Sequence, residues 1–376
     1  MTAQPLAPLD LAVPMKLHVV GVGGPGMSAI AIVLAEMGHD VTGSDIRDRS
    51  VLDRLRAANV RVHVGHDRAL VHDRDAITWS TSIPANNIEL SEAEIVGVPS
   101  MHRSGMLASI CAMARSLGVA GTHGKTSTTS MLMLMLVEAG LKPSFVVGGD
   151  VTDMGTGAQW TGGEWLVVEA DESDGTHLAL PLYGTILTNV ETDHLDYYGT
   201  FDAIVEGFDL YLAQIPGPKV LCLDDPVCAR LASHHGAITY GTSPEADFVA
   251  THIRAGAGSF TFDVVHHGAR LGTVELPLRG MHNVRNATGA LAMAISVGVP
   301  FEAAATALAK FGGVARRFDI RAIDGGATLV DDYAHLPSEI SAVMSAALGS
   351  GDKWKRLVAV FQPNRFNRMA VMSPEY

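Results

Sequence analysis

A short glycine loop that ends in lysine and threonine carries the strongest chemical signal in the sequence. The run Gly121-Thr122-His123-Gly124-Lys125-Thr126-Ser127 lies between an apolar stretch and a stretch of helical character. In such a loop successive backbone N–H groups surround phosphate oxygens, a lysine reaches the β and γ phosphates, and a threonine hydroxyl ligates Mg²⁺. Val119 stands where the long form of the motif has its first glycine, so we expect a shorter loop. Residues 121–127 are therefore predicted to bind a nucleoside triphosphate.

A second glycine loop lies near the start of the chain. Gly21-x-Gly23-x-x-Gly26 has the spacing in which the first glycine permits a tight turn and the second lets the backbone approach a diphosphate. Asp45 ends the next predicted strand, where a carboxylate can bind a ribose. We predict that this loop, with Gly24, and Asp45 bind a nucleotide. NAD and any other nucleotide diphosphate satisfy the pattern equally, and a glycine turn without a ligand is the structural alternative.

Two polar clusters follow apolar runs further along the chain. Glu169 closes an apolar run, and a carboxylate at the end of a buried strand needs a partner, which a metal ion near the phosphates would supply. His194 lies among acidic neighbours just after another such run, and we consider it a candidate metal ligand. A solvated acidic loop is the alternative for Glu172 and Asp174, and a structural role is the alternative for His194.

These residues require a sheet whose strands end at a common edge. The order strand, glycine turn, helix, strand over 17–45 predicts a βαβ unit, and 117–139 repeats strand, glycine loop and helix. Residues 246–278 alternate and predict antiparallel strands, so the central sheet is expected to be mixed. The other predicted strands are 60–64, 76–79, 165–169, 184–189, 327–330 and 356–361, and the predicted helices are 27–37, 52–58, 125–139, 283–297, 301–310 and 338–347.

Composition limits the classes of partner. The chain has 376 residues, 47% of them hydrophobic, and a formal net charge of −13, which argues against binding nucleic acid through broad phosphate neutralisation. The three cysteines form no CxxC pair, so neither a disulfide framework nor a zinc knuckle is expected. We find no secretory signal and no run long enough to cross a membrane, and therefore expect a cytoplasmic protein without a membrane or nucleic-acid partner.

Two nucleotide-binding loops with one phosphate-binding lysine favour an ATP-driven enzyme acting on a nucleotide-linked substrate. At this point the sequence resembles the Mur ligases, and among them the member that adds L-alanine. The similarity extends over nearly the whole chain and rests on the following segments: 18–28, 121–126, 169–174, 188–198, 280–283, 316–318, 331–335 and 361–363. It implies an α/β protein with a Rossmann-like UDP-binding domain (15–115), a P-loop-type ATP-binding domain (116–315) and an incomplete Rossmann-like domain for the amino acid (316–376).

The resemblance also implies roles for individual residues. Lys125 would hold the ATP phosphates, and Thr126, Glu169 and His194 would ligate Mg²⁺; Lys125, Glu169 and His194 are the expected catalytic residues. The other expected ATP-binding residues are His282, Asn283, Asn286 and Arg317. The expected substrate-binding residues, beside the first glycine loop and Asp45, are Ser82, Arg103, Asp332, His335, Arg365 and Arg368.

The implied reaction joins L-alanine to the carboxylate of UDP-N-acetylmuramate, with ATP activating the carboxylate as an acyl phosphate during peptidoglycan synthesis. Three alternatives remain open from the sequence. A ligase that recycles an intact tripeptide onto the same sugar nucleotide is the nearest. An NAD(P)-dependent oxidoreductase would use the first glycine loop, and a nucleotide sensor would bind without catalysis.

Two segments depart from the family pattern. His335-Leu336-Pro337 stands where the family usually has His-His-Pro, and Asn364-Arg365-Phe366 stands where it often has His-Arg-Tyr. Leucine cannot donate a hydrogen bond, so contacts of the third domain are expected to be altered. Because the chain stops at Tyr376, after about two βα units, we also expect this domain to be truncated. The sequence gives no indication of the oligomeric state.

Overall fold

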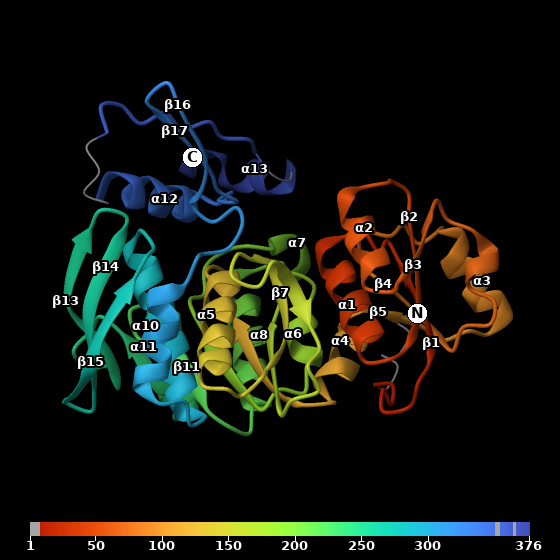
Figure 1. The fold of residues 1–376 in the computed structure, drawn as a ribbon, viewed down its shortest axis with the longest axis horizontal. Helices are drawn as coiled ribbons and strands as arrows, with labels where there is room; N and C mark the ends of the chain where they lie inside the picture. The colour runs from red at the N-terminus through yellow and green to blue at the C-terminus, as the bar shows by residue number, and fades with distance from the viewer. Residues whose placement is uncertain (1–7, 350–353, 364–365) are drawn as a thin grey trace. The chain divides into compact units, whose positions relative to one another are not determined.

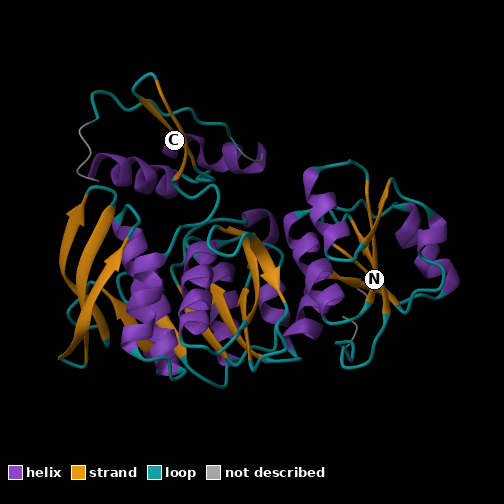
Figure 2. Ribbon diagram, viewed as in Figure 1, coloured by secondary structure: helices purple, strands orange, loops and turns teal. Residues whose placement is uncertain are grey.

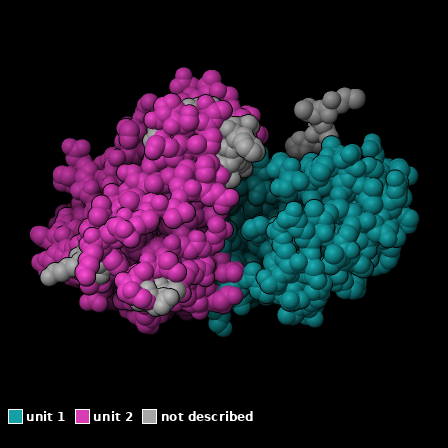
Figure 3. Space-filling model, turned by 90° about the horizontal axis from the view of Figure 1, so that it is seen from above, with its two compact units in different colours: residues 1–118, 141–149, 156–183 teal, residues 119–140, 150–155, 184–376 magenta. Residues whose placement is uncertain are grey.

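A computed structural model describes residues 8–349, 354–363 and 366–376 (Figure 1). The chain divides into two compact units, which Figure 3 shows in different colours. The first unit comprises residues 1–118, 141–149 and 156–183, and the second comprises 119–140, 150–155 and 184–376. Among the described residues, no helix is both long and apolar enough to cross a membrane. The predicted boundaries 15–115, 116–315 and 316–376 stay predictions.

The first unit contains a parallel five-stranded sheet in the order β3-β2-β1-β4-β5. Helices α1 and α2 lie on one side of this sheet and α3 on the other, which is the arrangement of a Rossmann-like domain (Figure 1). Helix α1 begins two residues before its predicted start because Pro25, at the first helical position, has its φ preset for a helix. The elements are β1 (Lys16–Val20), α1 (Pro25–Glu36), β2 (Asp40–Asp45), α2 (Ser50–Ala57), β3 (Arg61–Val64), η1 (Arg68–Leu70), β4 (Ala76–Trp79), α3 (Ile88–Val96), β5 (Ser100–His102) and α4 (Arg103–Cys111).

A second sheet has ten strands in the order β15-β14-β13-β12-β11-β10-β6-β9-β7-β8. Its strands β10 to β13 pair in parallel, whereas β13, β14 and β15 pair antiparallel, which confirms the predicted mixed sheet. The strands are β6 (Arg115–Ala120), β7 (Ser144–Val151), β8 (Thr156–Gln159), β9 (Trp165–Glu169), β10 (Gly184–Leu187), β11 (Lys219–Cys222), β12 (Ile238–Gly241), β13 (Phe248–Gly256), β14 (Ser259–His266) and β15 (Ala269–Leu276).

Helices of the second unit cover its strands and one another (Figure 2). Helix α5 packs against α10 and α11, and most of its side chains are buried, so the glycine loop before it sits on a fixed support. Helix α10 also packs on β11 and β12. The helices that accompany the ten-stranded sheet are α5 (Lys125–Glu138), α6 (Thr176–Ala179), α7 (Leu195–Tyr198), α8 (Phe201–Ala213), α9 (Pro226–His235), α10 (Met281–Ser296) and α11 (Phe301–Lys310).

The last part of the second unit holds a two-stranded antiparallel sheet and two helices. The elements are β16 (Asp319–Asp324), β17 (Ala327–Asp331), α12 (Pro337–Gly349), α13 (Phe366–Met372) and η2 (Ser373–Glu375). The strand predicted at 356–361 is wrong, because residues 354–363 form no strand. Its β-branched sequence lacks a partner strand there, and Val360 is 95% exposed. The α/β class itself is confirmed.

Candidate functional site

The glycine loop of the second unit is short, as predicted. Strand β6 ends at Ala120 and α5 begins at Lys125, with Gly121 at φ +122° and Gly124 at φ +81°. A methyl group on Gly121 would overlap the hydroxyl of Thr188 and lie 2.9 Å from the carbonyl oxygen of Asn189. Both the backbone conformation and the space at Gly121 therefore require glycine.

The residues just after β10 hold this loop in place. The Asn189 side chain accepts a hydrogen bond from the His123 N–H (2.8 Å) and donates one to the His123 carbonyl (3.1 Å). Thr188 Oγ1 donates to the same carbonyl (2.6 Å), and the Thr122 N–H donates to the Asn189 carbonyl (3.1 Å). The strand predicted over 184–189 ends at Leu187, and the two polar residues that follow turn to the loop instead.

Lys125, the residue expected to contact the ATP phosphates, folds back over the loop. Its Nζ donates to the carbonyl of Gly121 (2.6 Å) and to that of Thr122 (3.2 Å). Thr126 and Ser127 follow in the first turn of α5 and are buried. The positive end of the helix dipole and the ammonium group of Lys125 therefore lie at the same loop. Together they favour binding of an anionic ligand there.

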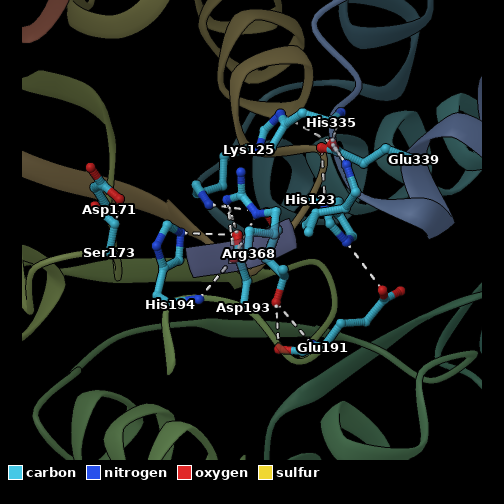
Figure 4. Close-up of polar contacts among 12 residues, drawn as sticks. His123, Lys125, Asp171, Ser173, Glu191, Asp193, His194, His335, Glu339 and Arg368 are labelled. Carbon is cyan, nitrogen blue, oxygen red and sulfur yellow. Dashed lines mark hydrogen bonds and ion pairs between the residues drawn. The ribbon is translucent and has the colours of Figure 1, made fainter. Parts of the chain in front are cut away.

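His123 lies between two carboxylates (Figure 4). Its Nδ1 is 3.2 Å from Glu339 Oε1, and its Nε2 is 3.2 Å from Glu191 Oε2. Because ionised carboxylates only accept hydrogen bonds, this geometry requires both ring nitrogens to donate, and the ring is an imidazolium. Burial by itself would lower the pKa of His123, but hydrogen bonds and charge from Glu191 and Glu339 raise it to about 9. The loop therefore carries two cations, Lys125 and His123.

His194, the N-cap of the short helix α7, belongs to a second charged cluster in this unit (Figure 4). Its Nε2 lies 3.1 Å from Asp193 Oδ2, and Arg368 Nη2 lies 3.1 Å from each oxygen of the same carboxylate. Although burial raises the pKa of Asp193, the charges of His194 and Arg368 bring it below its usual value. The carboxylate therefore orients the imidazole, as a partner behind a metal-binding histidine usually does.

Glu169, the third expected metal ligand, belongs to the first unit. It ends β9, and a methyl group on the nearby Gly148 would lie 2.6 Å from its Oε2. Glu169 Oε1 is buried, and no described residue forms a hydrogen bond with it. A buried carboxylate oxygen without a donor fits a hard cation such as Mg²⁺, which prefers oxygen ligands. Thr126 and His194 lie in the second unit, so the three-residue metal site stays a prediction.

Three of the residues expected to bind ATP lie at the beginning of α10. Asn286 is buried, and its amide oxygen would lie 2.7 Å from a methyl group on Gly124. Asn283 is buried too and donates to the carbonyl of Arg279 (2.8 Å). Burial, together with the charges of Arg285 and Arg317, lowers the pKa of His282 to about 4. The structure thus brings Asn286 to the glycine loop and leaves His282 neutral at pH 7.

In the first unit, the other glycine loop leads into α1. Gly21 has φ +73°, and Gly24 is the N-cap of the helix. Asp45 Oδ2 accepts a hydrogen bond from the Gly23 N–H (3.0 Å), and a methyl group on Gly23 would lie 2.7 Å from that oxygen. The glycine loop and the carboxylate that ends β2 therefore lie next to each other, as predicted, and the carboxylate accepts a hydrogen bond from an N–H group of the loop.

Arg103, at the start of α4, is held by two carboxylates of the loop after β9. Its Nη2 lies 2.7 Å from Asp171 Oδ2, and its Nε donates to Asp174 Oδ2 (2.9 Å). It also approaches the first glycine loop, because its Nη1 lies 3.5 Å from the position of a methyl group on Gly26. Ser82 is exposed in the segment between β4 and α3.

The third segment places its expected site residues differently. The carboxylate of Asp332 accepts hydrogen bonds from the N–H groups of Phe318 and Ala334, both at 2.7 Å, so it shapes its own loop. His335 Nδ1 lies 2.8 Å from the carbonyl oxygen of Tyr333. Arg317 approaches the Tyr333 ring at 5.6 Å. Arg365, and Asn364 with it, lie outside the described residues.

Several residues that organise these sites were absent from the sequence prediction. Thr188 and Asn189 hold the glycine loop, Asp193 orients His194, and Glu339 contacts His123. The polar end of the strand predicted over 184–189 was a usable signal for Thr188 and Asn189. No local signal connects Glu339 with His123, which lies 216 residues away.

Comparison with known proteins supports the resemblance seen in the sequence. The family model described as "Mur ligase family, catalytic domain" matches residues 16–115, and the model described as "Mur ligase middle domain" matches residues 119–294. The UDP-N-acetylmuramate–L-alanine ligase of Solidesulfovibrio magneticus is 41% identical over 365 residues, which cover 96% of this chain and 79% of that protein. The ligase of the same name from Caulobacter vibrioides is 40% identical over 377 residues, covering 97% and 80%.

Two solved structures have the same fold over most of the chain. UDP-N-acetylmuramate-alanine ligase MurC from Thermotoga maritima gives a TM-score of 0.83 at 29% identity, covering 95% of this chain and 83% of that one. The UDP-N-acetylmuramate:L-alanyl-gamma-D-glutamyl-meso-diaminopimelate ligase from Neisseria meningitides gives 0.73 at 27% identity, covering 81% and 100%. With relatives of at least 40% identity along nearly its whole length, this chain belongs to the Mur ligase family.

Proposed function

We propose that this protein is an ATP-dependent ligase that joins L-alanine to the carboxylate of UDP-N-acetylmuramate in peptidoglycan synthesis. The observation that carries the proposal is the loop 121–126, held by Thr188 and Asn189 at the start of α5. The loop occurs in a chain 40–41% identical to L-alanine ligases over 96–97% of its length. A cytoplasmic location, where ATP is made, is part of the same proposal.

The reaction consists of two substitutions. A carboxylate oxygen of UDP-N-acetylmuramate attacks the γ phosphorus of ATP, and ADP leaves, which forms an acyl phosphate. The amine nitrogen of L-alanine then attacks the acyl carbon, phosphate leaves from the tetrahedral intermediate, and the nitrogen loses a proton to form the amide. The first step needs positioning and neutralisation of the phosphate charge more than covalent help from the protein.

The residues of the glycine loop supply that positioning. The N–H groups at the start of α5 face the phosphates, and Lys125 exchanges the carbonyls of Gly121 and Thr122 for phosphate oxygens. Asn286, which touches the loop, and Asn283 one turn before it bind the nucleoside. Mg²⁺, held by Thr126, Glu169 and His194, would neutralise charge on the phosphates.

The first glycine loop binds the UDP part of the other substrate. Gly23 supplies an N–H group for the diphosphate, and Asp45 accepts a hydrogen bond from a ribose hydroxyl. Arg103, which approaches Gly26 of the loop, and Ser82 complete the proposed set of substrate-binding residues. Asp332, His335, Arg365 and Arg368 belong to the segment that binds the amino acid. Addition of an intact tripeptide is the second candidate function, because the chain also matches the structure of the Neisseria ligase over its whole length.

The test is phosphate release from ATP. We expect release only when UDP-N-acetylmuramate, L-alanine and Mg²⁺ are all present, and loss of release in Lys125→Ala. Lys310→Ala is the matched control, since Lys310 pairs with Glu138 at the surface. Equal release without the sugar nucleotide, or full activity in Lys125→Ala, would refute the proposal. Faster release with L-alanyl-γ-D-glutamyl-meso-diaminopimelate than with L-alanine would favour the second candidate.

A further inference from the structure

The carboxylate of Glu339 connects two parts of the second unit that are far apart in the sequence. Its Oε1 faces His123 of the glycine loop at 3.2 Å. Its Oε2 accepts hydrogen bonds from the N–H groups of His335 (2.8 Å) and Leu336 (3.1 Å), just before α12. Glu339 thus caps its own helix in the manner of a capping box and binds the loop with the same side chain. Ser338 Oγ adds a contact of 3.2 Å to His123 Nε2.

The backbone of the loop is held independently of this contact. Thr188 and Asn189, which follow β10, bind the carbonyl and N–H of His123. The imidazole of His123, in contrast, contacts α12 through Glu339 and Ser338. The backbone of the loop is therefore held without Glu339, whereas Glu339 and Ser338 connect the loop to α12.

We propose that Glu339 is a positioning residue: through His123 it holds α12, and the 332–335 segment before it, against the phosphate loop in the arrangement needed for ligation. The inference rests on the proposed function, because the 332–335 segment is the part assigned there to the amino acid. It separates two properties of the protein. Nucleotide binding depends on the loop, and turnover also depends on the contact between the loop and α12.

The direct test is Glu339→Gln, which preserves the shape of the side chain and removes its charge. We expect the affinity for Mg-ADP, measured by calorimetry, to change by less than about threefold, while kcat falls about tenfold, the effect of weakening one charge-assisted hydrogen bond. Glu302→Gln is the matched control: Glu302 is exposed in the first turn of α11 and should change neither quantity. An unchanged kcat in Glu339→Gln, or an equal loss in nucleotide affinity, would overturn the proposal.

A double-mutant cycle separates positioning from a general loss of structure. If Glu339 acts through His123, Glu339→Gln combined with His123→Asn should lower kcat no further than the more damaging single change. If the loss of kcat in the double variant equals the product of the losses in the two single variants, the proposal is contradicted. A second readout needs no ligase activity: the imidazole pKa of His123, followed by NMR, should fall from about 9 in Glu339→Gln. If the wild type has no ligase activity and the pKa of His123 still falls in Glu339→Gln, the proposed function is refuted, whereas the contact between Glu339 and His123 is confirmed.

A separate cluster on the surface of the second unit has the composition of a metal site. Asp209 on α8 faces His234 and His235 at the end of α9, with His234 Nδ1 at 2.9 Å and His235 Nε2 at 2.8 Å from Asp209 Oδ1. The three ligand atoms lie within 4.8 Å of one another. In a tetrahedral zinc site, bonds of roughly 2.0–2.2 Å separate neighbouring ligand atoms by about 3.3 Å. The two imidazole nitrogens would each have to move about half an ångström away from the Asp209 oxygen to admit an ion.

We infer that Asp209, His234 and His235 bind one divalent transition-metal ion of the zinc, nickel or copper class, which prefers imidazole ligands over the all-oxygen sets of Mg²⁺. The chain provides its own comparison in His266 and His267, another adjacent pair beside an aspartate. His266 stacks on Phe248, and His267 Nδ1 is 3.6 Å from Asp247, so this pair does not bring three ligand atoms together.

The probe is zinc chloride, added to the full chain and followed by calorimetry. We expect one site per chain whose affinity falls at least tenfold in His234→Ala/His235→Ala, and no such fall in His266→Ala/His267→Ala. Equal losses in both double variants would show that surface histidines bind zinc without a defined site, and would overturn the inference. An unchanged affinity in His234→Ala/His235→Ala would overturn it as well.

Discussion

Adding a single methyl group at either end of helix α5 tests whether the glycine loop is shaped for a ligand. Gly124, before the helix, and Gly140, after it, have φ values of +81° and +75°. Alanine in this left-handed region costs about 1–2 kcal/mol at either position. The surroundings differ, because the new carbon at Gly124 would lie 2.7 Å from Asn286 Oδ1, whereas at Gly140 it would meet nothing within 4 Å.

The overlap at Gly124 must be relieved by a shift of about half an ångström in the loop or in Asn286. Overpacking of this kind adds about 1–3 kcal/mol. We therefore expect Gly140→Ala to lose about 1–2 kcal/mol of stability and Gly124→Ala about 2–5 kcal/mol. In a unit of about 150–250 residues each kcal/mol lowers Tm by about 2–4 °C, so a thermal melt separates the two variants.

Nucleotide binding is the more decisive measurement. Because Gly124→Ala displaces the loop or Asn286, we expect the affinity for Mg-ADP to fall at least about tenfold, the equivalent of about 1.4 kcal/mol. Gly140→Ala should leave the affinity within about twofold, since it changes only the far end of the helix. The reasoning is refuted if the two variants lose equal affinity, or if Gly124→Ala binds Mg-ADP as tightly as the wild type.

Three further predictions follow from charge and burial. The pKa of His123 is raised from 6.5 to about 9, so its ion pairs stabilise the fold fully below about pH 6.5. The free energy of unfolding in urea should therefore fall by about 3 kcal/mol as the pH rises from 6.5 through 9. This fall should be absent in His123→Asn. Arg103→Gln removes the cation that pairs with Asp171 and Asp174, and should lower the free energy of unfolding by about 2–4 kcal/mol in the same assay. Arg115→Gln should lower it by less than about 1 kcal/mol, because its partner Glu164 is exposed. Equal losses in the two variants would contradict this prediction. Cys111, Cys222 and Cys228 are buried, with the pKa of Cys111 raised to about 12 and that of Cys222 to about 11, so a thiol reagent should modify none of them before unfolding and all three afterwards.

Local features were predictable from the sequence because their causes are local. The glycine loop, the start of α5 at Lys125 and the carboxylate that ends β2 each follow from residues a few positions apart. The antiparallel strands over 246–278 followed from alternation of apolar and polar residues in the same way.

The failures have tertiary causes. The 356–361 segment has high β propensity, yet strand formation requires a neighbour that supplies hydrogen bonds, and Val358 and Val360 remain exposed. Contacts such as His123 with Glu339, and Asp193 with Arg368, join positions more than 170 residues apart. They depend on how elements pack, which no pattern of spacing in one segment encodes.

The carboxylate of Asp45 has a consequence for inhibitor design. It accepts a hydrogen bond from the Gly23 N–H at 3.0 Å, so the protein carries its own competitor for that donor. A compound that offers only an anion to the loop has to displace this carboxylate and gains little, because one charged acceptor replaces another. A compound that also presents a hydroxyl group gives Asp45 a new donor as it leaves Gly23. Selectivity for sugar nucleotides over simple phosphates would then originate in an exchange of hydrogen-bond partners.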